Sequence, residues 1–262
     1  METRFVATPG YDDQRPGTAG LRKKVRVFQQ PGYLECFLQA VFDGAGPFEG
    51  KTLVAGGDGR YFNREALQTL ASVAAANGVA RLIVGRGGLL STPAASNLVR
   101  QRNAGGGFIL SASHNPGGPD GDFGVKFNTA NGGQASESLM AAVYRATQTL
   151  EGYRLADLGP IDFEATGART YGTLTVEIVD PVSDYAALME RLIDFHRIRS
   201  LLTGSGFRMR FDAMNAITGP YATDILATRL GAPAGTVMNG QPLEDFGGGH
   251  PDPNPVDAAE LV

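Results

Sequence analysis

The residues best suited to chemistry lie in segment 111–118, SASHNPGG, which follows the apolar run GGFIL. Ser113 and His114 stand at the end of a predicted strand, and an Asn-Pro-Gly-Gly turn comes after them. Proline and glycine favour a tight turn, because proline fixes φ and glycine accepts positive φ. Backbone N–H groups of such a turn can surround an exposed serine and bind a phosphate or oxyanion. The segment predicts either such a site at Ser113 or an ordinary strand-to-loop turn.

The neighbouring histidine is not expected to activate this serine as a simple pair. Serine is a weak nucleophile until a base or a charged environment activates it. His114 is next in sequence, and adjacent side chains on a strand point to opposite faces of the sheet. The spacing of Ser113 and His114 alone therefore indicates no Ser–His dyad.

Several cations could complete a phosphate site, since arginine and lysine are the usual clamps for phosphate. Arg22 and Lys23 lie in GTAGLRKKV, Arg60 lies in GDGRY, and Lys126 follows the Ser113 loop. Each of them, taken alone, is more often a solvated surface cation. Neither GxxxxGK[ST] nor a GxGxxG after a strand occurs, so the sequence gives no support for a nucleotide cofactor.

The sequence contains no established metal-binding pattern. His114, His196 and His250 lie far apart, and neither CxxC nor HExxH is present. Asp120 and Asp122 flank a glycine and could bind a hard cation, although such residues more often cap turns.

Composition limits the class of protein. The 262 residues are 42% hydrophobic and carry a net charge of −4, so the chain can bury a core. The charges form no long runs, which argues against nucleic acid or a membrane surface as partner. The single cysteine, Cys36, excludes an internal disulfide and suits a reducing compartment. Since no signal-like or membrane-spanning apolar segment is found, we expect a cytoplasmic protein.

Strand and helix patterns alternate through the first part of the chain. This alternation predicts a three-layer α/β/α domain with a parallel or mixed sheet. Ligands in open α/β sheets bind beyond the carboxyl ends of strands, where loops such as GGDGRY and SASHNPGG would converge. The expected elements are strands 51–56, 79–85, 105–113 and 174–180, and helices 64–77, 91–103 and 136–150.

A second α/β pattern begins after residue 185. It consists of a predicted helix over 183–202, a strand over 207–214, a helix over 219–231 and a helix start at 257–262. We therefore expect one domain at 1–185 and an incomplete second domain of the same type at 186–262.

Six motifs together resemble the α-D-phosphohexomutase family, and within it the glucose-specific phosphoglucomutase branch. The SASHNPGG element is highly specific, and GGPDGDFGVKFN beside it favours that branch over phosphomannomutases. The motifs lie at residues 17–25, 91–94, 111–128, 176–185, 211–222 and 245–255.

The resemblance implies that Ser113 carries a phosphoryl group and passes it between glucose 1-phosphate and glucose 6-phosphate. Glucose 1,6-bisphosphate is then the intermediate, and Mg²⁺ binds the phosphoserine oxygens of Ser113. Arg22 would bind the bisphosphate and Thr18 would lie in the same contact loop. Lys126 would transfer a proton with the sugar hydroxyl, and His114 would shape the loop or bind phosphate.

One departure from the family pattern limits this expectation. Family members are longer and hold magnesium with a DGDGDR loop, which is absent from this sequence. We therefore expect a truncated chain that is inactive alone and that belongs to a monomeric full-length enzyme. A non-catalytic homologue that binds sugar phosphates, or another phosphohexomutase such as a phosphomannomutase, remains the alternative.

Overall fold

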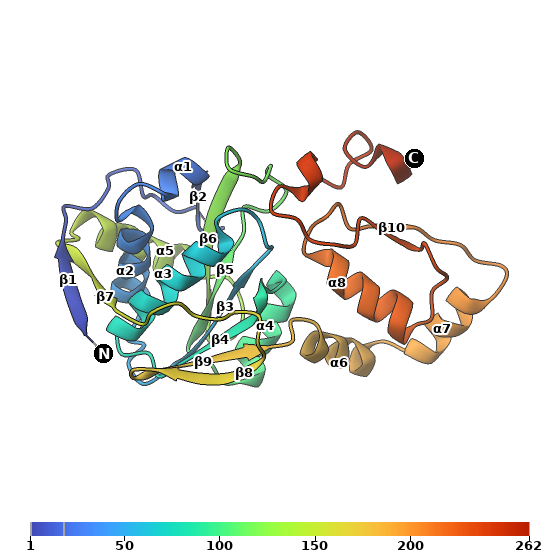
Figure 1. Ribbon diagram of the computed structural model, residues 1–262, viewed down its shortest axis with the longest axis horizontal. Coiled ribbons are helices and arrows are strands. Elements are labelled where there is room, and N and C mark those ends of the chain that lie inside the picture. The colour runs from blue at the N-terminus through green and yellow to red at the C-terminus, as the bar shows by residue number, and fades with distance from the viewer. Residues whose placement is uncertain (1, 18, 262) are drawn as a thin grey trace.

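A seven-stranded mixed sheet forms the centre of the molecule, in the order β2-β6-β5-β3-β4-β9-β8. The computed structural model describes residues 2–17 and 19–261 (Figure 1). Strands β5, β3, β4 and β9 run parallel, and β2, β6 and β8 pair antiparallel with their neighbours. The strands are β2 (Leu21–Lys24), β3 (Thr52–Gly57), β4 (Arg81–Leu89), β5 (Gly106–Leu110), β6 (Asp122–Thr129), β8 (Gly167–Tyr171) and β9 (Leu174–Val179).

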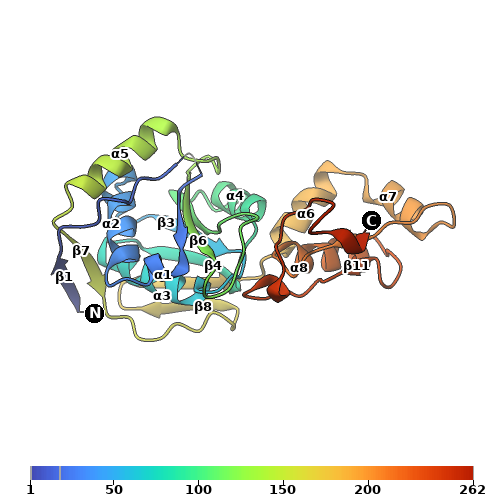
Figure 2. The same ribbon diagram turned by 90° about the horizontal axis from the view of Figure 1, so that it is seen from above.

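Helices cover both faces of this sheet, which confirms the predicted three-layer α/β/α domain (Figure 2). Helices α2 (Tyr33–Ala45) and α3 (Asn63–Ala76) pack on one face, with α5 (Glu137–Gln148) beside α2. Helix α4 (Thr92–Gln101) packs on the other face. The short helix α1 (Val25–Phe28) follows β2, and β1 (Thr3–Ala7) pairs with β7 (Gly152–Ala156) as a separate ribbon.

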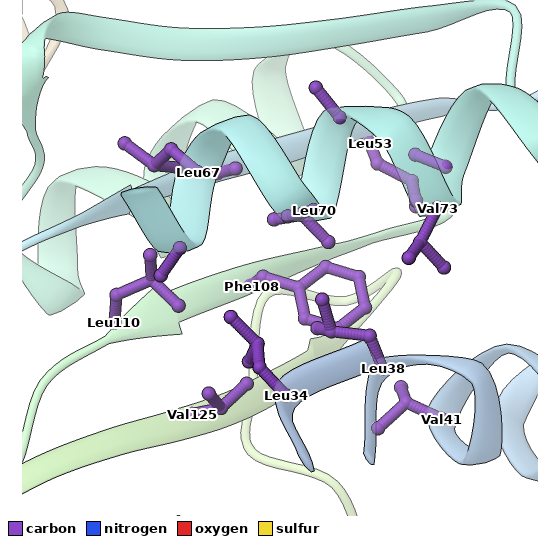
Figure 3. Packing of buried hydrophobic residues seen from close by; sticks show 14 of the residues in the cluster. Leu34, Leu38, Val41, Leu53, Leu67, Leu70, Val73, Phe108, Leu110 and Val125 are labelled. Atoms are coloured by element: carbon purple, nitrogen blue, oxygen red, sulfur yellow. The ribbon is translucent and has the colours of Figure 1, made fainter. Parts of the chain in front are cut away.

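The largest core lies between α2, α3 and the sheet (Figure 3). Leu67, Leu70 and Val73 are each fully buried, as their helical spacing along α3 predicts. They meet Leu38 from α2 and Phe108 from β5. Each such side chain contributes about 1.5–3 kcal/mol through burial, so this layer fixes the strand from which the Ser113 loop leaves.

Two edge strands were not predicted because their sequences carry no buried alternation. Strand β8 pairs with β9 while four of its five residues remain exposed. Strand β2 has the sequence LRKK, and such charged edges prevent pairing with other molecules.

The C-terminal part, residues 183–261, is less regular than its pattern predicts. The helix expected over 183–202 is two helices, α6 (Ser183–Leu192) and α7 (Phe195–Thr203), because Asp194 accepts from the Arg197 N–H at 3.0 Å and caps a new helix. The expected strand at 207–214 is reduced to β10 (Phe211–Asp212), which pairs in parallel with β11 (Val237–Met238). The division at residues 185 and 186 stays a prediction.

The last predicted helices also differ from expectation. Helix α8 (Thr218–Ala222) continues as a π-helical segment, Thr223–Arg229, in which Arg229 donates to Asp224 five residues earlier at 2.6 Å. The helix expected from 257 is a single 3₁₀ turn, Ala259–Leu261, and another such turn is Phe246–Gly248. Among residues 2–17 and 19–261, no helix is both long and apolar enough to cross a membrane.

Candidate active site at the Ser113 turn

Ser113 lies in a turn beyond the end of β5, with its side chain exposed. The Asn115 N–H donates to the Ala112 carbonyl at 3.3 Å and closes the turn. Ser113 has φ +61°, a left-handed conformation that residues other than glycine rarely adopt. Contrary to the prediction, Ser113 and His114 do not lie on opposite faces of a strand, because both residues belong to this turn.

Strand β6 holds the start of the turn. The Ser111 N–H donates to the Gly124 carbonyl at 2.9 Å, and the Ser113 N–H donates to Ser111 Oγ, also at 2.9 Å. A Cβ atom at position 124 would lie 2.4 Å from the Ser111 oxygen, so this approach requires glycine. The FGVKF part of the motif therefore supports the turn as well as contributing Lys126.

Arg60 lies beneath the turn and is not a solvated surface cation. Its side chain is fully buried. Nη2 donates to the Ser113 carbonyl at 2.8 Å, and Nη1 donates to the Asp122 carbonyl at 2.7 Å. The Asp58 carboxylate accepts from Nε at 3.0 Å. The GDGRY loop thus contributes an organised pair of residues, whose partners no local pattern in the sequence could reveal.

Arg22 and Lys126, two further residues of the predicted phosphate site, lie on the strands beside the turn. Arg22 on β2 pairs in register with Gly124, and Lys126 on β6 pairs with Ile109. Burial first, and then the charge of Arg22, hold the pKa of Lys126 below its ordinary value. This half-buried lysine therefore loses its proton more easily than a surface lysine does.

The N-terminal contact loop lies against Lys126. Thr18, its predicted substrate contact, lies outside the described residues. Gly17 and Gly20 on either side exchange two backbone hydrogen bonds of 3.0 Å. Gly20 has φ +85°, and a Cβ there would lie 2.8 Å from the Lys126 Cα. Lys23 forms an ion pair with Asp13 at 2.8 Å and does not join the cations at the turn.

The possible cation site at Asp120 and Asp122 is not formed, and the acidic residues that do lie close together are elsewhere. Asp122 is engaged with Lys24 at 2.8 Å, so it is not free to bind a cation together with Asp120. The ligand atoms of three residues of the C-terminal part lie within 4.8 Å of one another. These residues are His250, Asp252 and Asp257. The ring of His114 is 6.5 Å from the ring of His250, whereas His196 lies apart on α7.

Residues 244–246 of the C-terminal part contact the far side of the turn. The Glu244 carbonyl accepts from the Tyr61 N–H at 2.9 Å and from the Gly118 N–H at 3.1 Å. The Phe246 ring covers the Arg60 guanidinium, with its centroid 5.2 Å from Cζ. The motif DFGGGHPDPNP, which the sequence indicates only through the family resemblance, thus packs with its first residues against the loop that bears Ser113.

Comparison with known proteins agrees with this architecture. Residues 13–154 match the sequence pattern described as phosphoglucomutase/phosphomannomutase, alpha/beta/alpha domain I. The chain belongs to the phosphoglucomutase/phosphomannomutase family. The predicted resemblance is therefore confirmed, and the seven-stranded domain is domain I of that family.

Relatives within the family are phosphoglucomutases by name. The chain is 55% identical to the phosphoglucomutase of Rhizobium radiobacter over 258 residues, which cover 98% of this chain and 47% of that protein. It is 51% identical to the Schizosaccharomyces pombe phosphoglucomutase over 259 residues, with coverage of 98% and 47%. This family member thus spans about half the length of the curated relatives that it matches.

A solved structure shows the same fold. The open form of pp63/parafusin, a phosphoglucomutase from Paramecium, superposes with a TM-score of 0.93 at 42% identity. The match covers 99% of this family member and 49% of that chain. The irregular C-terminal part is thus included in the similarity.

Proposed function

We propose that this chain carries the phosphoryl-bearing site of a phosphoglucomutase, which interconverts glucose 1-phosphate and glucose 6-phosphate through glucose 1,6-bisphosphate. The observation that carries the proposal is the exposed Ser113 in a left-handed turn, with Arg22 and Lys126 on adjacent strands. Family membership supports it, because the relatives named above are phosphoglucomutases.

The proposed step moves one phosphoryl group between two oxygens. The bond between phosphorus and Ser113 Oγ breaks, and a new bond forms between phosphorus and a free hydroxyl oxygen of the hexose monophosphate. The proton from that hydroxyl finally protonates Ser113 Oγ, with Lys126 as the carrier. The resulting bisphosphate then reorients in the site and returns its other phosphoryl group to Ser113 by the reverse step.

The charges near Ser113 suit this exchange. A phosphoserine carries roughly −1.5 to −2 charge at neutral pH and raises the pKa of cations close to it. Lys126, whose pKa is lowered by burial and by Arg22, would regain affinity for its proton while Ser113 is phosphorylated. When the phosphoryl group leaves, that affinity falls, so the protonation of Lys126 follows the transfer. His114, exposed in the turn, would contact the phosphate.

Magnesium is implied by the family resemblance, but the carboxylates around Ser113 do not supply a site for it. Asp58 pairs with Arg60 at 2.9 Å, and Asp122 pairs with Lys24 at 2.8 Å. Among the described residues, the only group with three candidate ligands is the one that contains His250, Asp252 and Asp257. Ser113 is therefore the one metal contact proposed.

Labelled glucose 1,6-bisphosphate tests the proposal. Incubation with the purified chain should leave one phosphate on the wild type, detected by intact mass, and none on Ser113→Ala. Ser205→Ala, at an exposed serine of the C-terminal part, is the matched control and should label like the wild type. Equal labelling of Ser113→Ala and the wild type would contradict the assignment.

A second assay separates this half-reaction from the full cycle. With glucose 1-phosphate, Mg²⁺ and bisphosphate, we expect residues 1–262 alone to give no net conversion to glucose 6-phosphate. Robust turnover would show that this chain supplies more of the cycle than its site residues indicate.

A further inference from the structure

We propose that Arg60 is a positioning residue for phosphoryl transfer, which fixes the Ser113 turn by binding its backbone carbonyls. The inference rests on the proposed function of Ser113 and adds a residue to it. Arg60 does not bind the substrate itself, because its side chain has no exposed surface. It acts through the direction in which the turn presents Ser113.

Four of the five N–H groups of the Arg60 guanidinium donate hydrogen bonds. Nε donates to the Asp58 carboxylate at 3.0 Å, and Nη2 contacts the same carboxylate at 2.9 Å. Nη2 also donates to the Ser113 carbonyl at 2.8 Å. The two Nη1 hydrogens serve the carbonyls of Asp122, at 2.7 Å, and of Asn115, at 3.4 Å. One planar group thereby joins the beginning, middle and end of the loop.

The turn needs such support because its conformation is strained. A non-glycine residue in the left-handed region costs about 1–3 kcal/mol and persists only where the surroundings over-determine it. Ser113 at φ +61° is held at its N–H by Ser111 and at its carbonyl by Arg60. Without the second bond, the peptide that follows Ser113 is free to rotate, and the serine side chain turns with it.

The charge on Arg60 serves this geometry and is already paired. The carboxylate of Asp58, whose side chain is 9% exposed, balances the guanidinium. Phe246 covers the guanidinium face, so water does not compete for the carbonyl bonds. Within residues 2–17 and 19–261, no carboxylate forms an ion pair with Arg22 or Lys126, so these two cations are left to attract the phosphate.

Lysine cannot replace arginine at this position. An ammonium group has three donors around one nitrogen and cannot reach acceptors on the opposite sides of a planar fork. Arg60→Lys keeps the charge beside Asp58 but loses the bond to the Ser113 carbonyl. It therefore tests position separately from charge.

Single-turnover labelling by glucose 1,6-bisphosphate is the first measurement. We expect Arg60→Lys to lower the maximum rate by about 100-fold, the cost of a misplacement near 1 Å, with an unchanged half-saturating bisphosphate concentration. Arg81→Lys is the matched control, because Arg81 forms a partly exposed pair with Glu177 away from the turn and should label normally. A wild-type rate in Arg60→Lys would overturn the proposal.

Chemical rescue of the labelling rate distinguishes loss of the guanidinium from a general loss of stability. In Arg60→Ala, millimolar guanidinium should fill the vacated space and restore part of the labelling rate, whereas sodium at the same concentration should not. An unrescued rate in a variant that melts like the wild type would contradict the proposal.

Hydrogen exchange separates failure of this inference from failure of the proposed function. In Arg60→Lys, amides of residues 111–122 should exchange faster while those of β3 and β4 stay protected. If the wild type takes up no phosphate label, the proposed function fails. Faster exchange in Arg60→Lys that is confined to residues 111–122 would even then show that Arg60 holds the turn. Unchanged exchange there, or faster exchange everywhere, would overturn the inference.

Discussion

The loop that bears Ser113 and the C-terminal part of the chain are built in different ways. The loop leaves a strand whose residues are all buried, and Arg60 beneath it donates hydrogen bonds to three of its backbone carbonyls. The described residues of the C-terminal part form two strands of two residues each, and the buried apolar cluster of that part is small: it consists of Leu202, Leu230 and Ala232. Leu192 there is 68% exposed, and Val256 is 83% exposed.

This contrast shows how a strained catalytic turn can be maintained. The strain at Ser113 is supported from beneath by domain I, through Arg60 and the layer of α2 and α3. Residues 244–246 of the C-terminal part contact the other side of the turn, but few contacts hold these residues in place. We therefore expect changes in domain I, or at its contact with the C-terminal part, to affect the whole protein, and changes within the core of the C-terminal part to remain local.

The largest loss of stability is expected from breaking the buried ion pair between Asp58 and Arg60. Asp58→Asn leaves the Arg60 charge buried without a counter-ion, which costs about 3–5 kcal/mol. Glu177→Gln removes the partner of the more exposed Arg81 and should cost about 0–1 kcal/mol. Urea unfolding of both variants measures the difference. Equal losses would show that the Asp58–Arg60 pair is not desolvated as the contrast requires.

Two leucine truncations compare the two cores. Leu70→Ala in α3 should lower the free energy of unfolding by about 3–5 kcal/mol and destabilise every part of the chain. Leu202→Ala should speed hydrogen exchange only within residues 183–261, because its buried cluster is small. A global loss in Leu202→Ala would mean that the two parts unfold as one unit.

The contact of Tyr221 between domain I and the C-terminal part should contribute less to stability than the Asp58–Arg60 pair or Leu70. The Tyr221 hydroxyl accepts from the Ser91 N–H at 3.0 Å and donates to the Pro181 carbonyl at 2.8 Å, and all of this is buried. Tyr221→Phe leaves both backbone groups unpaired and should cost about 1–3 kcal/mol. Thermal melting measures the loss, and Tyr171→Phe, on the edge strand β8, serves as the control that should melt like the wild type.

The smallest effect concerns Lys126 and pH. Its pKa is lower in the folded protein than the ordinary 10.5, so folding disfavours its charged form. That penalty is full below the folded pKa and disappears as the pH rises towards 10.5. The stability of the wild type relative to Lys126→Met should therefore increase over this range. A difference that is constant with pH would contradict the lowered pKa.

The sequence predicted those features that depend on local pattern. The apolar spacing of Leu67, Leu70 and Val73 predicted α3, and the alternation of strands and helices predicted the three-layer domain. The SASHNPGG motif predicted the turn and its serine. Family resemblance, rather than spacing, supplied the roles proposed for Arg22 and Lys126.

Features that depend on contacts distant in sequence could not be predicted in this way. Arg60 reaches the Ser113 carbonyl across 53 residues, and only the fold brings them together. The exposed edge strand β8 carries no buried alternation that would reveal it. The break at Asp194 did have a local signal, since aspartate is a favoured N-cap, but the apolar spacing on both sides concealed it.

The most direct test of the account is the location of phosphate on the chain. After incubation with glucose 1,6-bisphosphate, fragment mass spectrometry of the peptide that spans residues 106–126 would identify the modified side chain. The account predicts a single phosphate on Ser113 in the wild type, with much slower labelling in Arg60→Lys. Phosphate on Ser111 or elsewhere, with Ser113 unmodified, would contradict it.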